Sequence, residues 1–588
     1  QILLAQLPET YNFYNNNLPI FTASMLSPLA AAGNTYYHYY LIDSTLVDQE
    51  KHYLLHFKTK NPFYATFNGE MTIDSATCAL RHIRATIPVQ NSINFLRNLT
   101  IEQHYAADNT VSSEQTNMLM DFAIKADSSK LFPTLMLSRS TQITPVEHPT
   151  LRTLPITPLA NDSLILPALD SLNNTLLFKT AKFIAYVFQT GYIPMTKHVE
   201  LGQINQFLHF SHPEGYRLTL PLRTTEELWK NVCLEAMVGY GTSDRAWKGY
   251  GKINIALPTQ RRHHMYFKYS DEYIHSDVDE FHEYLRENSV FGPQINLITN
   301  LMEKVPFNEK YFYNPMTRRQ EGRIHFEDDW NNYLETQSYL KIGQLGYGLA
   351  TQDYHSQPSL FYATLGASAR LSFNERKVDL HFHRKHIYNH LPVIYIGAEM
   401  GSYQLDNMPS YRMYGNLQLL LRHNVDLGMA GELDYRVQAG LVFGKVPYPL
   451  LHHFAANQTY TFDPDRFSLM NIKQYAADQY IALHAHWNGK GVLFNLIPGL
   501  RYARLRELLV LKVAYGGYRN DHQSVLAFPK NELVNYQILS APTTPYVELG
   551  AGIGNILRIG EIYGVFRVTH LDDPTPWWAI RFRLHIGM

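Results

Sequence analysis

This sequence of 588 residues has few cysteines, almost no net charge and no long apolar run. Each of these features argues against one class of protein. The two cysteines, Cys78 and Cys233, lie far apart, so the sequence predicts neither a disulfide framework nor a cysteine-based metal cluster. The 51 basic and 52 acidic side chains leave a net charge of −1, so we expect no nucleic acid among the partners. The longest apolar stretches are broken before they reach about 18 residues, so we expect no transmembrane helix.

Aromatic residues are abundant, at 13% with 41 tyrosines, whereas charged residues make up only 18%. Aromatic side chains favour β-strands. The mean hydropathy of −0.25 does not separate a soluble β protein from a membrane β-barrel, because lipid-facing and lumen-facing residues alternate along a barrel strand and average out. The composition therefore predicts a large β protein, and the periodicity of its strands must identify the architecture.

The chain divides into three parts. Between residues 35 and 143, seven strand-like segments follow one another with short polar breaks, which predicts an antiparallel sheet over one apolar face. Five prolines between residues 145 and 167 then exclude regular structure. We expect a β-rich domain at 1–143, a linker and connector at 144–212, and a second β domain at 213–588.

After residue 213 the predicted strands become longer and alternate strictly. In the last fifteen residues one face is wholly apolar and the other carries arginine, histidine and glycine; the apolar side chains are Trp578, Ile580, Phe582, Leu584, Ile586 and Met588. A soluble sandwich and an outer-membrane barrel both give such strands. Spanning strands need roughly 9 to 11 residues and soluble strands average about 5 to 6, and the longer segments here favour the barrel.

The predicted fold is therefore all-β, a transmembrane antiparallel β-barrel of about 16 strands preceded by a periplasmic antiparallel β-sheet domain. The strands are expected to start near residues 214, 230, 247, 262, 320, 333, 358, 376, 391, 411, 430, 477, 505, 544, 560 and 576. This count makes 445–476 the sixth outer loop. It also assigns the long gap 271–319 to a short periplasmic turn, which is a conflict.

Several blocks of the sequence resemble an outer-membrane family of unknown function from Bacteroidota, whose members usually follow a carboxypeptidase-regulatory-like domain. The blocks are "HPEGYRLTLPLRT" (212–224), "MVGYGTSDRAWKGYG" (237–251), "FGKVPYPLL" (443–451), "DPDRFSLMNIKQYAADQY" (463–480) and "LFNLIPGLRYARLRELLVLKVAYG" (493–516). With the N-terminal blocks, the resemblance covers most of residues 26–588. It implies an outer-membrane barrel with a periplasmic N-terminal domain, and lipid and lipopolysaccharide as its surroundings.

The predicted architecture is also similar, more distantly, to the barrel-assembly and translocation barrels that include BamA and TamA. In that group the sixth loop folds into the lumen, where its arginine contacts an acid of the inner wall. We expect the same here: Arg466 pairs with an inner-wall acid, and Phe467, Leu469 and Met470 pack, in a loop latch that also contains Asp463 and Asp465. The first and last strands are expected to close the barrel, with the closure residues Glu214, Tyr216, Trp578, Ile580, Phe582 and Leu584.

Enzymatic and metal-binding alternatives have weaker support. Residues 463–471 lack the glycine and spaced oxygen ligands of a calcium loop. The histidine pairs fit a polar inner wall; they are His381 with His383, His263 with His264, and His452 with His453. Residue patterns typical of catalytic triads or paired catalytic carboxylates occur no more clearly than chance would produce. We therefore expect no enzyme, no cofactor and no metal site.

Three functions remain open. The first is envelope biogenesis or translocation of proteins or lipoproteins, with other envelope proteins or lipoproteins as partners. The second is a channel or transporter for a small solute, and the third is a structural barrel that scaffolds a complex. The similarity to assembly barrels favours the first.

Overall fold

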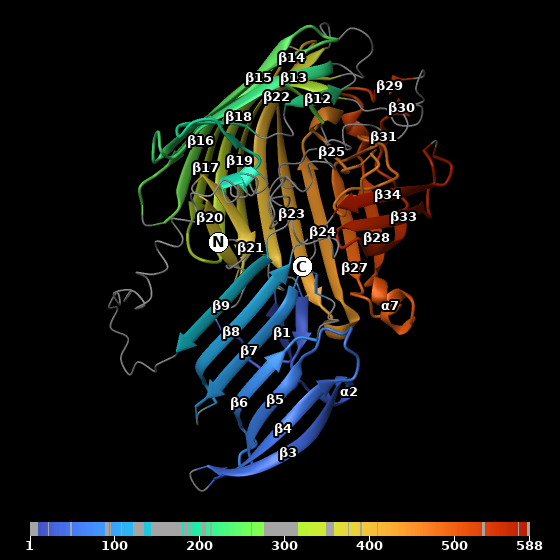
Figure 1. Cartoon of the computed structure of the whole chain (residues 1–588). Helices are drawn as coiled ribbons and strands as arrows, with labels where there is room; N and C mark the ends of the chain where they lie inside the picture. The colour runs from blue at the N-terminus through green and yellow to red at the C-terminus, as the bar shows by residue number, and fades with distance from the viewer. Residues whose placement is uncertain are drawn as a thin grey trace.

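The computed structural model describes residues 10–121, 134–142, 179–275, 316–347 and 358–584, with interruptions of at most four residues inside these ranges. The described chain is all-β, with antiparallel sheets and almost no helix. Figure 1 shows a smaller sheet from the N-terminal part (blue) at one end of a large curved sheet. The prolines of the predicted linker lie outside the described residues.

The described N-terminal residues form one seven-stranded antiparallel sheet in chain order, which confirms the seven predicted strands. The strands are β3 (Tyr37–Val47), β4 (Glu50–Thr59), β5 (Asn68–Asp74), β6 (Leu80–Thr86), β7 (Leu96–Tyr105), β8 (Val111–Asp121) and β9 (Thr134–Gln142).

One face of this sheet is covered by a hairpin of β1 (Asn17–Ile20) and β2 (Ala23–Leu26), which precedes the single turn α2 (Gly33–Tyr36). Phe13 and Ile20 from this segment pack with Ile83 and Leu99 of the sheet, and all four are fully buried. Burying a side chain of this size stabilises the fold by about 1.5–3 kcal/mol. The sheet thus has its own core and leaves its other face to solvent.

The turn between β5 and β6 depends on Asp74. Its carboxylate accepts hydrogen bonds from the Arg81 guanidinium at 2.9 Å and from the backbone N–H groups of Ala76 at 2.7 Å and Thr77 at 3.2 Å. The Arg81 hydrogen bond, followed by the two backbone bonds, holds the pKa of Asp74 well below its usual range. The unfolded chain therefore binds the proton more readily, so this stabilisation is present at neutral pH and is lost as the pH falls below about 4.

We expect the Asp74→Asn variant to lower the melting temperature of the full chain at pH 7, and the difference from wild type to shrink as the pH is lowered toward 3. Thermal melting across this pH range measures the effect. Asp43→Asn, at an exposed carboxylate, is the matched control. A difference between Asp74→Asn and wild type that does not vary with pH would contradict the assignment.

The described remainder of the chain forms an eighteen-stranded antiparallel sheet. Its strands, in order, are β10 (Ile193–Pro194), β11 (Val199–Leu201), β12 (Leu208–Ser211), β13 (Gly215–Thr224), β14 (Val232–Gly241), β15 (Trp247–Ala256), β16 (His263–His275), β17 (Met316–Asp329), β18 (Leu334–Gly346), β19 (Ser359–Ser372), β22 (Val393–Leu405), β23 (Arg412–Asp426), β24 (Glu432–Phe443), β27 (Gln479–Asn488), β28 (Arg506–Gly517), β32 (Tyr546–Ile556), β33 (Gly560–Arg567) and β34 (Trp578–Leu584).

Short elements occupy the connections. They are the hairpin of β20 (Arg376–Leu380) and β21 (His383–Ile387), the turns η3 (Gly428–Ala430), η4 (Tyr448–Leu450), η5 (Phe494–Leu496), α7 (Leu500–Ala503) and η6 (Asn520–His522), and the small strands β25 (His452–His453), β26 (Tyr475–Ala477), β29 (Lys530–Asn531), β30 (Tyr536–Gln537) and β31 (Leu539–Ser540).

The two faces of the large sheet differ as the alternation predicts. On β19, Leu360, Tyr362 and Thr364 are buried on the inner face, whereas Phe361 and Leu365 are 40% and 63% exposed on the outer face. The last strand repeats the pattern, with Arg581 buried and Phe582 exposed. The outer face is therefore apolar and uncovered, and the inner face holds buried polar and charged groups.

Two predictions about the strands need correction. The start near 376 is wrong, because β20 and β21 pair only with each other in a separate hairpin. The first long strand, β13, is also not the edge, because β11 and β12 from the predicted connector pair with it. The sequence missed β11 and β12 because they are only three and four residues long.

Without a spanning strand near residue 376, the long gap 271–319 is no longer assigned to the end opposite the long connection 445–476. Because antiparallel connections alternate between the two ends of a sheet, the connection from β16 to β17 lies at the same end as the one from β24 to β27. Residues 276–315 themselves lie outside the described residues. The turn from Asp426 to Glu432 between β23 and β24 lies at the opposite end, which we call the short-turn end.

The N-terminal sheet contacts the short-turn end. The Asn17 side chain donates to Asp426 at 3.5 Å, Asn94 donates to Asn555 at 2.5 Å, and the rings of Phe63 and Tyr502 meet edge to face at 5.4 Å. Figure 1 shows β1 and α7 toward this end and β25, β29 and β30 toward the other. The long connection between β24 and β27 therefore starts at the end remote from the N-terminal sheet.

Candidate functional site

The connection between β24 and β27, residues 444–478, lies against the inner face of the large sheet; we call it the inner loop. Phe467, Leu469 and Met470, which the sequence predicts to pack, are at most 1% exposed. Phe467 and Met470 join a buried cluster with Tyr480 and Tyr546 of the wall. Leu469 belongs to a second cluster, on β28, β33 and β34. An irregular segment thus has the burial of a protein core.

Phe467 is the main apolar anchor of the inner loop. Its ring meets those of His484 at 4.8 Å and Tyr546 at 5.6 Å, both on the wall, and that of Phe454 in the loop at 6.3 Å. Aromatic contacts of this kind add to the effect of area burial. The anchor therefore joins two wall strands, β27 and β32, to one loop side chain.

A flat platform on the wall receives His452 of the loop. Gly440 makes the platform, because a Cβ atom at this position would lie 2.5 Å from the Tyr480 ring. The Tyr480 ring therefore lies flat, and the imidazole of His452 stacks on it with 3.4 Å between centroids and 5° between planes. Burial lowers the pKa of His452 well below its usual value, so this imidazole is neutral at pH 7.

Glu548 on β32 is the wall residue that binds the loop backbone. Its carboxylate accepts the N–H groups of Ser468 and Leu469, both at 2.8 Å, and the hydroxyl of Tyr546 at 3.0 Å. The side chain is fully buried. A buried carboxylate needs such donors to offset its desolvation, so Glu548 and the loop segment 468–469 depend on each other.

Lys512 on β28, the cross-strand partner of Glu548, also binds the loop. Its ammonium donates to the carbonyl of Asp463 at 2.8 Å, to the hydroxyl of Ser468 at 3.3 Å and to the carbonyl of Arg466. This side chain is also fully buried. Lys512 therefore fixes the turn of residues 463–468 by its carbonyl groups.

A charged tether between loop and wall has its cation on the wall. Arg466 pairs with Asp463 within the loop at 3.5 Å and donates to the Ala456 carbonyl at 3.4 Å. An ion pair between loop and wall is made by Asp465 of the loop and Arg436 of β24 at 3.3 Å. Arg436 also donates to the Asp465 carbonyl at 2.9 Å. Spacing alone could not indicate which side would supply the cation.

The inner loop also pairs with the last strand. The Phe462 N–H donates to the Phe582 carbonyl at 2.6 Å, and the Phe582 N–H donates to the Tyr460 carbonyl at 2.9 Å. Arg581, fully buried, donates to the Ser468 carbonyl at 2.6 Å. The loop therefore pairs alongside β34 through a short parallel bridge, on the edge of β34 that faces away from β33.

The predicted closure residues do not join the first and last strands. Within the described ranges, hydrogen-bonded pairing runs from β10 to β34 and does not link the two ends. Glu214 lies buried just before β13, with ion pairs to Arg217 at 3.1 Å and Lys248 at 3.3 Å. The aromatic and aliphatic members point outward: Tyr216, Trp578, Ile580 and Phe582 are exposed, and Leu584 is half-buried.

At the short-turn end, the β20–β21 hairpin forms ion pairs with wall residues. Arg384 pairs with Asp329 at 2.6 Å and with Glu335 at 3.3 Å, and Lys377 pairs with Glu335 at 2.5 Å. His386 lies 3.1 Å from the same carboxylate. The segment predicted as a spanning strand is thus a second structure bound to the wall. Of its predicted histidine pair, His381 is outside the described residues.

Histidines of the other two predicted pairs make polar contacts with protein groups. His263 lies 2.6 Å from Asp328 on the paired strand, and Arg262 contacts His264 at 3.2 Å. His453 lies 2.9 Å from the Tyr448 carbonyl. Four wall residues that bind the loop could not be predicted from sequence: Arg436, Lys512, Glu548 and Arg581. Alternation along their strands could place them on the polar face but could not connect them with the loop.

None of the helices in the described part of the chain is long and apolar enough to cross a membrane.

Fold and site together define an antiparallel β protein with an apolar outer face, whose inner face holds a buried loop. Two models of one family of unknown function (DUF5686) match the chain: the first at residues 5–132, and the model of its C-terminal domain at residues 351–527. Together they match more than half of the chain, which therefore belongs to this family. No curated protein matches it.

Among solved structures, the chain is similar to BamA from Haemophilus ducreyi lacking POTRA domains 1–3, at 9% identity and a TM-score of 0.36, over 69% of this chain and 77% of that one. It is also similar to CdiB from Acinetobacter baumannii, at 10% identity and a TM-score of 0.32, over 63% of this chain and 56% of that one.

Proposed function

We propose that the protein is an outer-membrane β-barrel with its N-terminal sheet in the periplasm. In this proposal it acts in envelope biogenesis or in translocation of proteins or lipoproteins, without an enzymatic activity of its own. Its surroundings are outer-membrane lipid and lipopolysaccharide, and other envelope proteins or lipoproteins are its partners. The single observation that carries the proposal is the inner loop, bound by buried charges on the inner face of a sheet whose outer face is apolar.

The outer face supports the membrane location. The long strands from β13 to β32 have 10 to 15 residues, enough for tilted strands to cross a bilayer core of about 30 Å. Large apolar side chains are exposed along them, for example Leu218 at 64%, Leu365 at 63% and Met400 at 65%. Apolar exposure on this scale is costly in water and is the normal outer surface of a barrel in lipid.

We expect Leu365→Lys to impair folding into a membrane. A lysine on the lipid face near the bilayer midplane costs about 2–4 kcal/mol. The measurement is the fraction that folds into lipid vesicles, read from the shift in gel mobility between unheated and heated samples. Ser368→Lys is the matched control, because it places the same charge on the inner face of the same strand. Equal folding of the two variants would contradict a lipid-facing outer surface.

The inner loop favours the biogenesis proposal over an open channel. A solute channel needs a lumen lined by solvated charge, whereas Glu548, Lys512 and Arg581 here are fully buried against the loop. A bound loop that can be displaced is suited to a barrel that opens for a client. The N-terminal sheet, at the short-turn end, is placed to receive such a client from the periplasm.

Depletion of the protein tests this function. We expect the levels of several outer-membrane proteins or surface lipoproteins to fall, measured by quantitative proteomics of isolated outer membranes. A complementing copy of the wild-type chain restores them. If both groups keep their levels and the uptake of a single solute is lost instead, the biogenesis proposal is wrong and the channel alternative takes its place.

A further inference from the structure

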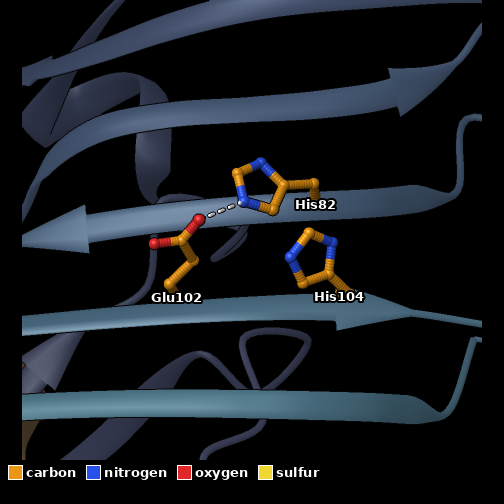
Figure 2. Close-up of side chains that lie close together, drawn as sticks. All are labelled: His82, Glu102 and His104. Atoms are coloured by element: carbon orange, nitrogen blue, oxygen red, sulfur yellow. Dashed lines mark hydrogen bonds and ion pairs between the residues drawn. The ribbon is translucent and has the colours of Figure 1, made fainter.

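The exposed face of the N-terminal sheet carries a group of three side chains that the inner loop does not involve. These are His82 on β6 and Glu102 and His104 on β7. One ligand atom from each lies within 4.8 Å of the others. Figure 2 shows the three side chains together on one face of the two strands, with the carboxylate of Glu102 pointing toward the His82 ring.

The strand register brings this group together. His82 and His104 are direct cross-strand partners in the antiparallel pair of β6 and β7. Glu102 is two residues from His104, so the two side chains leave β7 on the same face. The backbone therefore fixes all three positions, and the grouping does not depend on a flexible loop.

The distances suit a small ion. The Nε2 atom of His82 is 3.1 Å from Oε1 of Glu102, and the two imidazole centroids are 4.5 Å apart with 36° between the planes. Zinc at about 2.0–2.1 Å from each ligand in a tetrahedron requires ligand atoms about 3.3 Å apart. The pair of His82 and Glu102 already has nearly this spacing, and the ligand atom of His104 lies within 4.8 Å of both.

The second carboxylate oxygen of Glu102 has a neighbour of its own. Its Oε2 atom lies 3.9 Å from Nε of Arg84, one position further along β6 on the same face. This distance is too long for a hydrogen bond, so Arg84 contributes a nearby positive charge and leaves both carboxylate oxygens available to an ion. The Arg84 side chain is 63% exposed, so its charge is largely solvated at the site.

We propose that His82, Glu102 and His104 form a binding site for a divalent transition-metal ion of the zinc class, which departs from the absence of a metal site expected from the sequence. Two imidazoles and a carboxylate are ligands that zinc prefers, and three protein ligands leave a fourth position open. The side chains of His82 and Glu102 are 28% and 35% exposed, so the ion has a path from solvent and the fourth position takes water. The site is independent of the proposed function of the barrel.

Zinc binding to the purified full chain in detergent, after treatment with a chelator, tests the proposal. We expect the wild type to bind one more zinc ion than the double variant His82→Gln, His104→Gln, measured by competition with a chromogenic chelator. Glu102→Gln is expected to weaken this ion at least tenfold. His56→Gln is the matched control, since His56 is a histidine of the same sheet that lies 3.9 Å from Glu70 and belongs to no such group of three among the described residues. Equal zinc binding by the wild type and the double variant would overturn the site.

A second measurement uses the unmodified chain, so it does not depend on the folding of a variant. Diethyl pyrocarbonate modifies accessible imidazoles, and the modified peptides are identified by mass spectrometry. We expect Zn²⁺ to protect His82 and His104 while His56 reacts as before. If all three histidines react alike with and without Zn²⁺, the proposal is wrong.

Discussion

Replacing Glu548 by glutamine is expected to release the inner loop from the wall. The amide presents a donor where the carboxylate now accepts two backbone N–H groups, and the buried Lys512 loses an attractive negative charge. Hydrogen bonds to a charged group contribute about 1.5–3 kcal/mol, which corresponds to roughly a 10- to 150-fold shift toward the released loop. The measurement is the rate of trypsin cleavage after Arg466 and Lys473, mapped by mass spectrometry.

Glu399→Gln is the control for this experiment. Glu399 also accepts hydrogen bonds on the inner face, from the Tyr339 hydroxyl at 2.6 Å and the Lys341 ammonium at 3.0 Å, but these partners belong to the wall. We expect trypsin to cleave Glu399→Gln at the wild-type rate. Equal protection of the loop in Glu548→Gln and wild type would mean that Glu548 does not hold the loop.

Replacing Phe467 by alanine is expected to open the inner face to ions. The substitution leaves a cavity between β27, β32 and the loop, and deletion of a buried phenylalanine side chain typically costs about 3–5 kcal/mol. The sheet is held together by its own interstrand hydrogen bonds. We therefore expect most of this free-energy loss to weaken the binding of the loop to the wall and little of it to destabilise the sheet. The measurement is single-channel conductance in planar bilayers, which should rise well above the wild-type value.

Phe373→Ala removes the same side chain at a position that is 50% exposed, where the ring stacks on that of Tyr333 with 5.9 Å between centroids. We expect wild-type conductance from this control. If Phe467→Ala folds into the membrane and conducts no more than Phe373→Ala, then the inner loop does not block the passage of ions and this prediction is wrong.

The sequence predicted an all-β protein with antiparallel strands because alternation is a local signal. The faces of β19, β24 and β34 could be assigned from one residue to the next, since a strand exposes alternate side chains to different surroundings. The same signal produced the error at residues 376–387, where a short hairpin alternates like a spanning strand. Alternation indicates that a strand has one apolar and one polar face, but it does not indicate which sheet the strand joins.

The site could be predicted only in part. The apolar character of Phe467, Leu469 and Met470 indicated packing, but the partner of each charged residue is set by register across strands far apart in sequence. Asp465 meets Arg436 because β24 and the loop turn are adjacent in space, and Arg466 then turns back to Asp463. The group of His82, Glu102 and His104 escaped notice for the same reason, although Glu102 and His104 have the i, i+2 spacing of one strand face.

The pairing of Tyr460 and Phe462 with Phe582 makes the inner loop a competitor for any other chain that approaches β34. An exposed strand edge is a template for pairing, and here backbone groups of that edge are already engaged by the protein itself. Addition of a foreign strand at Phe582 and retention of the loop are mutually exclusive. The two equilibria are therefore linked: the affinity of the edge for a new strand rises in proportion to the fraction of molecules in which the loop is released.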